Sequence, residues 1–219
     1  ARQCRQFFVD AAIEGVEIDE KITDLAGKYF DLPSDINVTT YDGRAYLNAV
    51  HEKYDVIMVD AYQDITIPFQ MSSKEFFTLV RDHLNEGGIM VVNMNMHTDK
   101  EGNINQYLSD TIAGVFGNVC TAEVPGTTNR ELFAAVDASV LENLSGKAEK
   151  LENPELKVMM QTVSAGLTSY EKGDYLLTDD KAAVELLGMQ VIDELINSEM
   201  GYYKEVFRSE GIAGLLKSM

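Results

Sequence analysis

Acidic residues stand at the ends of three short apolar runs in the first third of the chain. Glu17, Asp42 and Asp60 are the carboxylates of interest. Segments with helical spacing of apolar residues separate the runs, which is typical of an open parallel α/β sheet. Ligands bind at the carboxyl edge of such sheets, so these three side chains are candidates for chemistry.

The first two carboxylates suit the recognition of a nucleoside. An acidic residue at the position of Glu17 can accept hydrogen bonds from ribose hydroxyls. Its alternative role is to cap the helix that starts near Glu20, although Asp19 fits that cap better. Asp42 can accept from the exocyclic amine of a base, with Gly43 allowing a sharp turn, but Asp-Gly is also an ordinary turn.

Asp60 suits proton transfer. The strand before it, residues 56–59, is apolar on both faces. We therefore expect a partly desolvated carboxylate with a raised pKa, which favours a general base acting on an amine. The alternative is a cap of the following loop, which is long and contains Pro68.

The segments around these strand ends read as alternating helices and strands. Helices are predicted over residues 20–30, 45–50, 74–84 and 103–116, and strands over residues 89–94, 119–124 and 131–138. The short turn over residues 125–130 indicates that the last two strands are antiparallel. A mostly parallel α/β sheet finished by an antiparallel hairpin resembles the Rossmann-like sheet shared by class I S-adenosylmethionine methyltransferases and aminopropyltransferases.

The C-terminal third is predicted to be mostly helical. We expect a Rossmann-type domain over residues 1–187 and a helical C-terminal extension over residues 188–219. Asp179 and Asp180, which come shortly before this extension, are interpreted as caps of the helix that follows them.

Residues 1–12 read as the end of a helix already in progress. In a doubly wound sheet that helix follows the first strand, which lies at the centre, between the strands ending at Asp19 and Asp60. Without this strand the sheet would be split into two halves with unpaired interior edges. We therefore expect a central strand and a Gly-rich turn upstream of Ala1 in the natural protein.

Composition narrows the classes of partner. The chain has 219 residues, is 45% hydrophobic and carries a formal net charge of −18. Nucleic acid and anionic membranes would be repelled, whereas a cationic substrate would be attracted; an acidic surface also keeps a protein soluble. The chain has no run of 18 apolar residues and no signal-peptide pattern at its start, so no membrane span is expected.

Cysteine and histidine residues give no sign of a metal site. Cys4 and Cys120 are isolated, which favours a reducing cytoplasm over a disulfide framework. His51, His83 and His97 are scattered without the spacing of metal ligands, so no metal is expected.

Several motifs together point to a family. They are Val-Glu-Ile-Asp at 16–19, Tyr-Asp-Gly-Arg-Ala-Tyr-Leu at 41–47, Lys-Tyr-Asp-Val-Ile-Met-Val-Asp-Ala at 53–61, Phe-Phe at 76–77, Gly-Gly at 87–88 and Leu-Leu-Thr-Asp-Asp-Lys-Ala-Ala-Val-Glu at 176–185. With them the chain resembles the spermidine synthase (polyamine aminopropyltransferase) family over roughly residues 1–187. It looks closer to a divergent, spermidine-synthase-like subgroup than to the core enzymes.

The resemblance implies a role for each strand-end carboxylate. Glu17 would hold the ribose of the co-substrate, decarboxylated S-adenosylmethionine, and Asp42 would accept from its adenine amino group. The resemblance also puts Gly43 and Ala61 at the cofactor. Asp60 would deprotonate the attacking amine of a polyamine such as putrescine. The reaction is an in-line displacement at the carbon next to a sulfonium, so the enzyme positions two partners and removes a proton.

The loop after Asp60 departs from the family pattern. That loop usually reads Asp-Ser-Ser-Asp-Pro, with a second Asp three residues after the first. Here Gln63 stands at that position and Asp64 follows one residue late. Both are candidate contacts for the amine substrate.

Three functions remain open. The first is aminopropyl transfer from decarboxylated S-adenosylmethionine to a polyamine, the second is S-adenosylmethionine-dependent methyl transfer, and the third is an inactive nucleoside-binding or interaction domain. The expected partners are a small cationic amine and a second copy of the chain in a homodimer. Tyr202 and Tyr203 in the helical tail are interpreted as packing or oligomer contacts.

Overall fold

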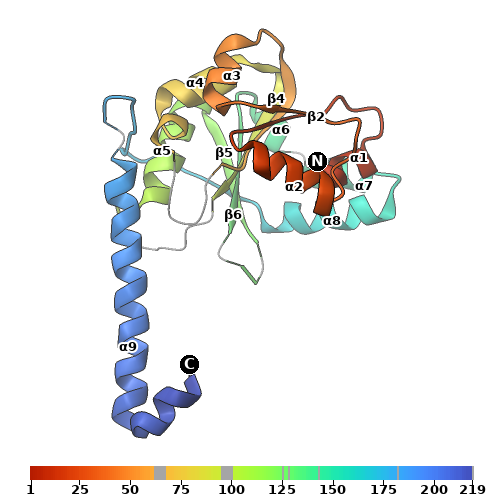
Figure 1. The fold of residues 1–219 in the computed structure, drawn as a ribbon. Coiled ribbons are helices and arrows are strands. Elements are labelled where there is room, and N and C mark those ends of the chain that lie inside the picture. Colours follow the sequence, from red (N-terminus) through yellow and green to blue (C-terminus); the bar gives the residue numbers. More distant parts are fainter. Residues whose placement is uncertain are drawn as a thin grey trace.

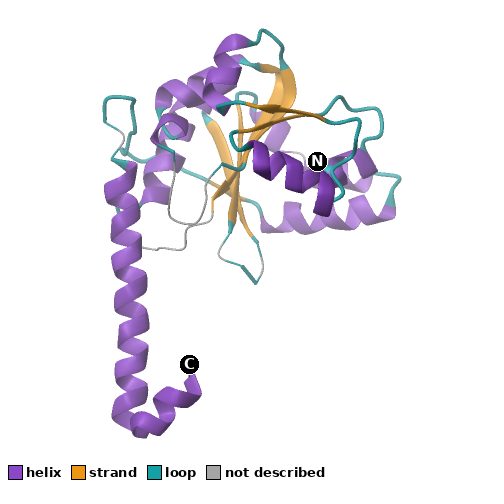
Figure 2. Ribbon diagram, in the orientation of Figure 1, coloured by secondary structure: helices purple, strands orange, loops and turns teal. Residues whose placement is uncertain are grey.

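Two separate sheets, helices around them and one long projecting helix make up the fold, as described by a computed structural model (Figures 1 and 2). The structure describes residues 1–61, 68–94, 101–124, 126–127, 129–142, 144–181 and 183–218. Within these ranges no helix is both long enough and apolar enough to cross a membrane.

The N-terminal part contains the smaller sheet. After α1 (Arg2–Phe7), the strands β1 (Glu14–Glu17) and β2 (Asn37–Thr40) pair in parallel and are connected by α2 (Glu20–Tyr29). Asp19 caps α2 as predicted, since its carboxylate accepts from the backbone N–H of Lys21 at 2.8 Å.

The next segment begins the larger sheet. It contains α3 (Gly43–Ala49), β3 (Tyr54–Val59), the 3₁₀ turn η1 (Phe69–Met71), α4 (Lys74–Asp82) and β4 (Leu84–Met94). Helix α4 ends two residues before the predicted limit, and β4 starts five residues before the strand predicted over residues 89–94. Gly87 has φ +73°, in the left-handed region that favours glycine, where the register of β4 against β3 shifts.

The hairpin completes this sheet. Helix α5 (Ile104–Phe116) leads into β5 (Asn118–Glu123) and β6 (Arg130–Ala135), which are antiparallel as predicted. The strand order is β3-β4-β6-β5-β7, with β3 and β4 parallel and the other pairs antiparallel. The edge strand β7 (Thr168–Ser169) was not predicted, because two residues carry no periodicity.

One face of the larger sheet carries the core. Apolar side chains of α4 and α5, among them Phe76 and Leu108, pack against Val59, Val92 and Leu132 from the strands. Phe76, Leu108, Val92 and Leu132 are at most 1% exposed. This packing fixes the edge from which the candidate site projects.

The two sheets are joined by few contacts. Among the described residues, β1 pairs with β2 alone and β3 with β4 alone. The hydroxyl of Tyr54, at the start of β3, donates to Glu14 Oε2 of β1 at 3.1 Å, and Tyr46 of α3 donates to the same oxygen at 3.2 Å. Burial and the neighbouring Glu14 carboxylate raise the pKa of the Tyr54 hydroxyl, so it stays a donor. The predicted central strand stays a prediction.

The remaining helices follow the hairpin. They are α6 (Ala138–Glu142), α7 (Leu144–Glu149), α8 (Pro154–Gly166) and α9 (Val184–Ser218). Helix α9 begins four residues before the predicted start of the tail and bends at Gly211, whose backbone is not helical. It extends away from the sheets (Figure 1).

Candidate active site

Three polar side chains form a row across the carboxyl edge of the larger sheet. Val59 pairs with Val92, so Asp60 and Asn93 follow side by side, and Asn93 pairs in turn with Glu131 of the antiparallel strand β6. The Asn93 Nδ2 amide donates to Asp60 Oδ1 at 3.0 Å. We call Asp60, Asn93 and Glu131 the acidic row.

The acidic row is suited to a cation that donates hydrogen bonds. The half-buried Glu131 has a raised pKa, first because burial disfavours its charged form and then because of the nearby Asp60 charge. The Asn93 Oδ1 atom is buried and accepts no hydrogen bond from the described residues. The two carboxyl groups, beside an amide oxygen without a donor among the described residues, can accept the N–H groups of an alkylammonium ion.

Asp60 itself is exposed, so the prediction of a partly desolvated Asp60 is wrong. The strand before it is not covered on both faces, since Val56 is 47% and Met58 63% exposed. Ala61 is half-buried and packs against the core. Gln63 and Asp64 lie outside the described residues.

Glu17 lies at the end of β1, where it has a local backbone partner. Its Oε1 atom accepts from the backbone N–H of Asp19 at 2.9 Å, next to the start of α2. The side chain is half-buried. The structure therefore gives one carboxylate oxygen of Glu17 a structural role.

Asp42 occupies the corresponding place after β2. It caps α3, because its Oδ1 atom accepts from the backbone N–H of Ala45 at 2.8 Å. A Cβ atom on Gly43 would lie 3.5 Å from the Met71 side chain, an ordinary contact, so space alone does not demand glycine there. In the described part of the chain, no hydrogen bond joins Glu17 or Asp42 to the acidic row.

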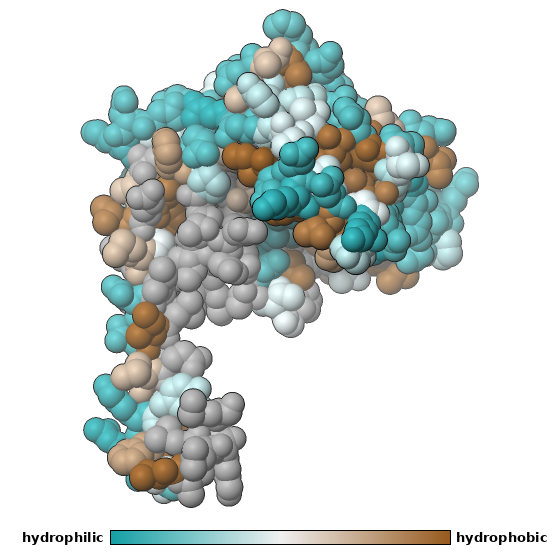
Figure 3. Space-filling model, viewed as in Figure 1, coloured by the Kyte–Doolittle hydropathy of each residue, from teal (hydrophilic) through white to brown (hydrophobic). Residues whose placement is uncertain are grey.

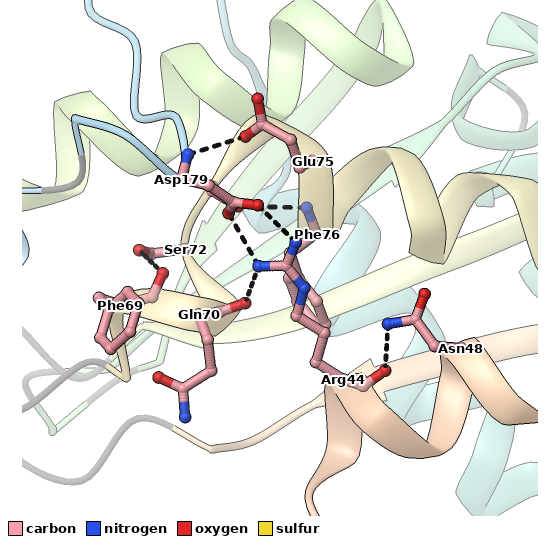
Figure 4. Close-up of polar contacts among 9 residues, drawn as sticks. Arg44, Asn48, Phe69, Gln70, Ser72, Glu75, Phe76 and Asp179 are labelled. Atoms are coloured by element: carbon pink, nitrogen blue, oxygen red, sulfur yellow. Dashed lines mark hydrogen bonds and ion pairs between the residues drawn. The ribbon is translucent and has the colours of Figure 1, made fainter.

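An ion pair that the sequence did not predict is formed by Arg44, two residues after Asp42 in the first turn of α3. Both terminal nitrogens of Arg44 donate to the carboxylate of Asp179, at 2.8 and 2.6 Å (Figure 4). The same guanidinium donates to the carbonyl of Gln70 at 3.0 Å, and the Ser73 hydroxyl donates to Asp179 at 2.5 Å. These bonds connect the start of α3, the 3₁₀ turn and the start of α4. We call the Arg44–Asp179 pair the clamp.

The clamp changes the proton affinity of both partners. The hydrogen bond from Arg44 lowers the pKa of the Asp179 carboxyl, and the Ser73 hydroxyl acts in the same direction. The hydrogen bond to Asp179 raises the pKa of Arg44. The interpretation of Asp179 as a cap of the following helix is wrong, because its carboxylate turns toward α3 and α4 instead.

A late segment of the chain, residues 170–181, carries Asp179 to this place. We call it the strap. Its anchor is Asp110 of α5, 1% exposed, which accepts from the Tyr170 hydroxyl and from the backbone N–H groups of Gly173 and Tyr175 at 2.7–3.0 Å. A Cβ atom on Gly173 would lie 2.6 Å from an Asp110 carboxylate oxygen, so this position requires glycine.

The strap then crosses from α5 to α4. Thr111 Oγ1 accepts from the backbone N–H of Leu177 at 2.9 Å, and the Leu177 carbonyl accepts from the backbone N–H of Lys74 at 2.9 Å. A hollow of about 470 Å³ lies along the strap where it passes the first turn of α5, lined in part by Tyr107, Tyr175 and Asp180. No residue of the acidic row lines this hollow.

The described residues contain no group of three or more His, Cys, Asp or Glu side chains placed to hold a metal ion. The acceptors of the acidic row can bind a cationic amine and remove one of its protons.

Sequence reasoning missed Asn93 and Glu131, although signals for both exist. Asn93 is a polar residue inside an otherwise apolar strand, and Glu131 opens the second strand of the predicted hairpin. Antiparallel pairing puts the start of that strand at the carboxyl edge of its neighbour. The register that aligns the two residues comes from the structure.

Comparison with known proteins gives a family match over most of the described core. The family model described as the spermine/spermidine synthase domain matches residues 3–138. A curated relative from Bifidobacterium longum, named "Probable polyamine aminopropyl transferase", is 56% identical over an alignment that covers the whole chain and 53% of the relative. The chain thus spans about half the length of the curated relatives it matches, the share being 46% for a polyamine aminopropyltransferase of Vibrio vulnificus.

Solved structures share the fold. A probable spermidine synthase from Corynebacterium glutamicum has a TM-score of 0.55 at 18% identity, covering 80% of this chain and 68% of its own. Human methyltransferase-like protein 13, in complex with SAH, also has a TM-score of 0.55, at 19% identity, covering 74% of this chain and 73% of its own. The predicted methyltransferase-like α/β fold is confirmed.

Proposed function

The chain belongs to the spermine/spermidine synthase family, and from this premise we propose that it carries the amine-activating site of a polyamine aminopropyltransferase. The acidic row is the observation that carries the proposal. It presents two carboxyl groups, beside an amide oxygen that has no donor among the described residues, at the strand edge where ligands of such sheets bind.

In the proposed reaction Asp60 is the general base. An alkylammonium group has a pKa of about 10.4, so near neutral pH it must lose a proton before it can attack. Asp60 takes that proton, and Asn93 orients the carboxylate through its 3.0 Å hydrogen bond. The amine nitrogen then bonds to the carbon next to the sulfonium of decarboxylated S-adenosylmethionine. The C–S bond breaks toward sulfur, and neutral methylthioadenosine leaves.

Glu131 and Asn93 are proposed to hold the amine in place. The Asn93 Oδ1 atom can accept one N–H of the substrate, and Glu131 supplies the second carboxyl group of the site. In this sequence the second Asp of the family loop is shifted by one residue, and Glu131 offers a carboxyl group from a different strand. Gln63 and Asp64 stay candidate substrate contacts.

The nucleoside of the co-substrate is proposed to lie at the ends of β1 and β2. Glu17 and Asp42 each use one oxygen for a backbone N–H, which leaves the second oxygen for a ribose hydroxyl or an adenine amino group. Gly43 and Ala61 are proposed to lie beside the nucleoside. The clamp at Arg44 would hold the Asp42 turn while the co-substrate binds.

The same proposal covers the partners and the setting of the protein. The net charge of −18 would attract a cationic amine and repel nucleic acid and anionic membranes. A homodimer in a reducing cytoplasm is proposed on the same terms. Methyl transfer is the second candidate, since human methyltransferase-like protein 13 shares the fold, but the acidic row favours a cationic acceptor.

The test is aminopropyl transfer to putrescine by the full-length protein. Asp60→Asn should lower kcat/KM at least about 100-fold, because it removes the base. Asp55→Asn is the matched control: it lies on the same strand, at the opposite edge, and accepts from Asn85 Nδ2 at 2.9 Å. Activity of Asp60→Asn within a few-fold of wild type would overturn the role of Asp60. Methyl transfer from S-adenosylmethionine without aminopropyl transfer would select the second candidate, and binding of neither nucleoside would select an inactive domain.

A further inference from the structure

Helix α9 leaves a row of apolar side chains uncovered. Of its described side chains, Val184 and Leu187 pack on the core at its start. Beyond them the helix stands away from the body, with apolar side chains along it (Figures 1 and 3). Those that are between 51% and 68% exposed are Leu186, Met189, Ile196, Met200, Tyr202, Phe207 and Ile212.

Four residues of this set, together with the partly exposed Tyr203, have the spacing of a helix-pairing stripe. Met189, Ile196, Met200, Tyr203 and Phe207 follow one another at intervals of seven, four, three and four residues. These intervals keep side chains on one face of a helix and fit a coiled-coil seam in which Asp193 fills the position between Met189 and Ile196. We call these five residues the α9 stripe.

Four residues of the α9 stripe are placed symmetrically about position 198, and the fifth, Tyr203, is mirrored by Asp193. Met189 and Phe207 lie nine residues on either side of it, and Ile196 and Met200 lie two residues on either side. Two copies of α9 that run antiparallel, with a two-fold axis at this position, therefore put Met189 against the partner's Phe207 and Ile196 against the partner's Met200. A two-fold contact of this kind uses the same surface on both copies.

Charges on α9 favour the same arrangement. Asp193, in the seam itself, lies five residues before position 198, and Lys204 lies beside the seam six residues after it; both are exposed. In the antiparallel pair each Asp193 lies beside the partner's Lys204, so the ion pair forms twice. Residues 184–199 contain four acidic and no basic residues, whereas the basic Lys204 and Arg208 follow, so a parallel pair would align acidic halves with each other.

We propose that α9 is the dimerisation element of this protein and pairs antiparallel with α9 of a second copy. The pairing ends before Gly211, where the backbone turns away from the helix axis. The inference rests on the proposed homodimer and not on the proposed chemistry.

The first test is the mass of the full-length protein in solution, measured by light scattering over a concentration series. Wild type should be a dimer. Ile196→Glu combined with Met200→Glu should raise the dissociation constant at least about 100-fold, because four carboxylates would enter the centre of the seam. Glu205→Lys, on the opposite side of the helix, should leave the dimer intact. A wild-type monomer, or a dimer that survives the double substitution, overturns the proposal.

Charge exchange tests the predicted neighbours. Lys204→Glu and Asp193→Lys should each weaken the dimer about threefold to tenfold, since each removes two exposed ion pairs and adds two like-charge contacts. The double variant should recover wild-type affinity. Additive weakening in the double variant would contradict the register.

Cross-linking tests the direction. In a Cys4→Ser, Cys120→Ser background, a mixture of Met189→Cys and Phe207→Cys proteins should form a disulfide between copies. Met189→Cys alone should not, because its two sulfurs would be separated by 18 residues of helix, about 27 Å. A disulfide in Met189→Cys alone would show a parallel pair and overturn the proposal. Loss of aminopropyl transfer in any variant bears on the proposed function and leaves this result unchanged.

Discussion

Each of the two sheets of this chain contains a parallel pair of strands, β1 with β2 and β3 with β4, but the two sheets are packed very differently. Among residues 1–58, Ile36 is the only one that is buried, and Ile22 and Leu25 of α2 are 45% and 46% exposed. The larger sheet has a continuous core under β3, β4 and β6. The candidate amine site therefore stands on a well-packed frame, whereas the candidate nucleoside contacts Glu17 and Asp42 stand on a part of the chain that its own packing holds loosely.

The largest expected effect compares the same substitution in both regions. Leu132→Ala, at a fully buried position of β6, should lower the free energy of unfolding by about 2–5 kcal/mol because it opens a cavity. Leu25→Ala, on α2, should cost about 1 kcal/mol or less. Urea unfolding followed by circular dichroism measures both. Equal losses would show that the two regions are packed alike in solution.

The next effect concerns the function of the well-packed region. Glu131→Gln should raise KM for putrescine about tenfold with a smaller change in kcat, because it removes a charge-assisted contact to the bound ammonium. KM for the nucleoside co-substrate should not change. The control is Glu123→Gln. This residue ends β5 beside the start of β6, where Glu131 lies, but it is paired with Arg130. A change confined to KM for the nucleoside co-substrate would mean that Glu131 contacts the nucleoside and not the amine.

A smaller effect tests the connection between the regions. Asp179→Asn should cost about 1 kcal/mol of stability, since the pair is partly exposed. Because Arg44 lowers the pKa of Asp179, the stabilisation is present above the unfolded-state pKa of about 3.9 and is lost as the pH falls through the lower folded-state value. Unfolding of wild type and variant from pH 7 to pH 2 should therefore converge in acid. Asp180→Asn, next in the chain, is the control and should follow wild type throughout.

The smallest effect is a pH dependence within the acidic row. Burial and Asp60 raise the pKa of Glu131 in the folded state, so its contribution to stability is full below the unfolded-state pKa of about 4.3 and is lost as the pH rises through the folded value. Glu131→Gln should thus gain stability relative to wild type as the pH rises, so the melting temperature of the variant minus that of wild type should increase. Melting curves across this pH range measure this difference. A difference that falls as the pH rises would mean that a cation in the folded protein already neutralises the Glu131 carboxylate.

The sequence alone predicted the helices and strands whose apolar residues recur with a clear periodicity, and the side chains that cap or follow them. The strand that ends at Val59, the cap at Asp19 and the antiparallel hairpin follow from local pattern. The acidic row needed the register of β4 against β6, which joins Asn93 to Glu131 over a distance that no local pattern spans. The exposure of Asp60 could not be read from the apolar run before it, because burial depends on what covers a strand.

The strap has a consequence for the order of folding. Arg44 and its partner Asp179 are separated by 135 positions in the chain. On a ribosome the start of α3 leaves the tunnel long before the carboxylate that holds it exists. Until then the N–H groups of the Arg44 guanidinium donate their hydrogen bonds to water. Bringing Asp179 to Arg44 also closes a long loop, which is entropically costly. The turn at Asp42 should thus be among the last parts of the protein to become ordered, although it is synthesised well before Asp179.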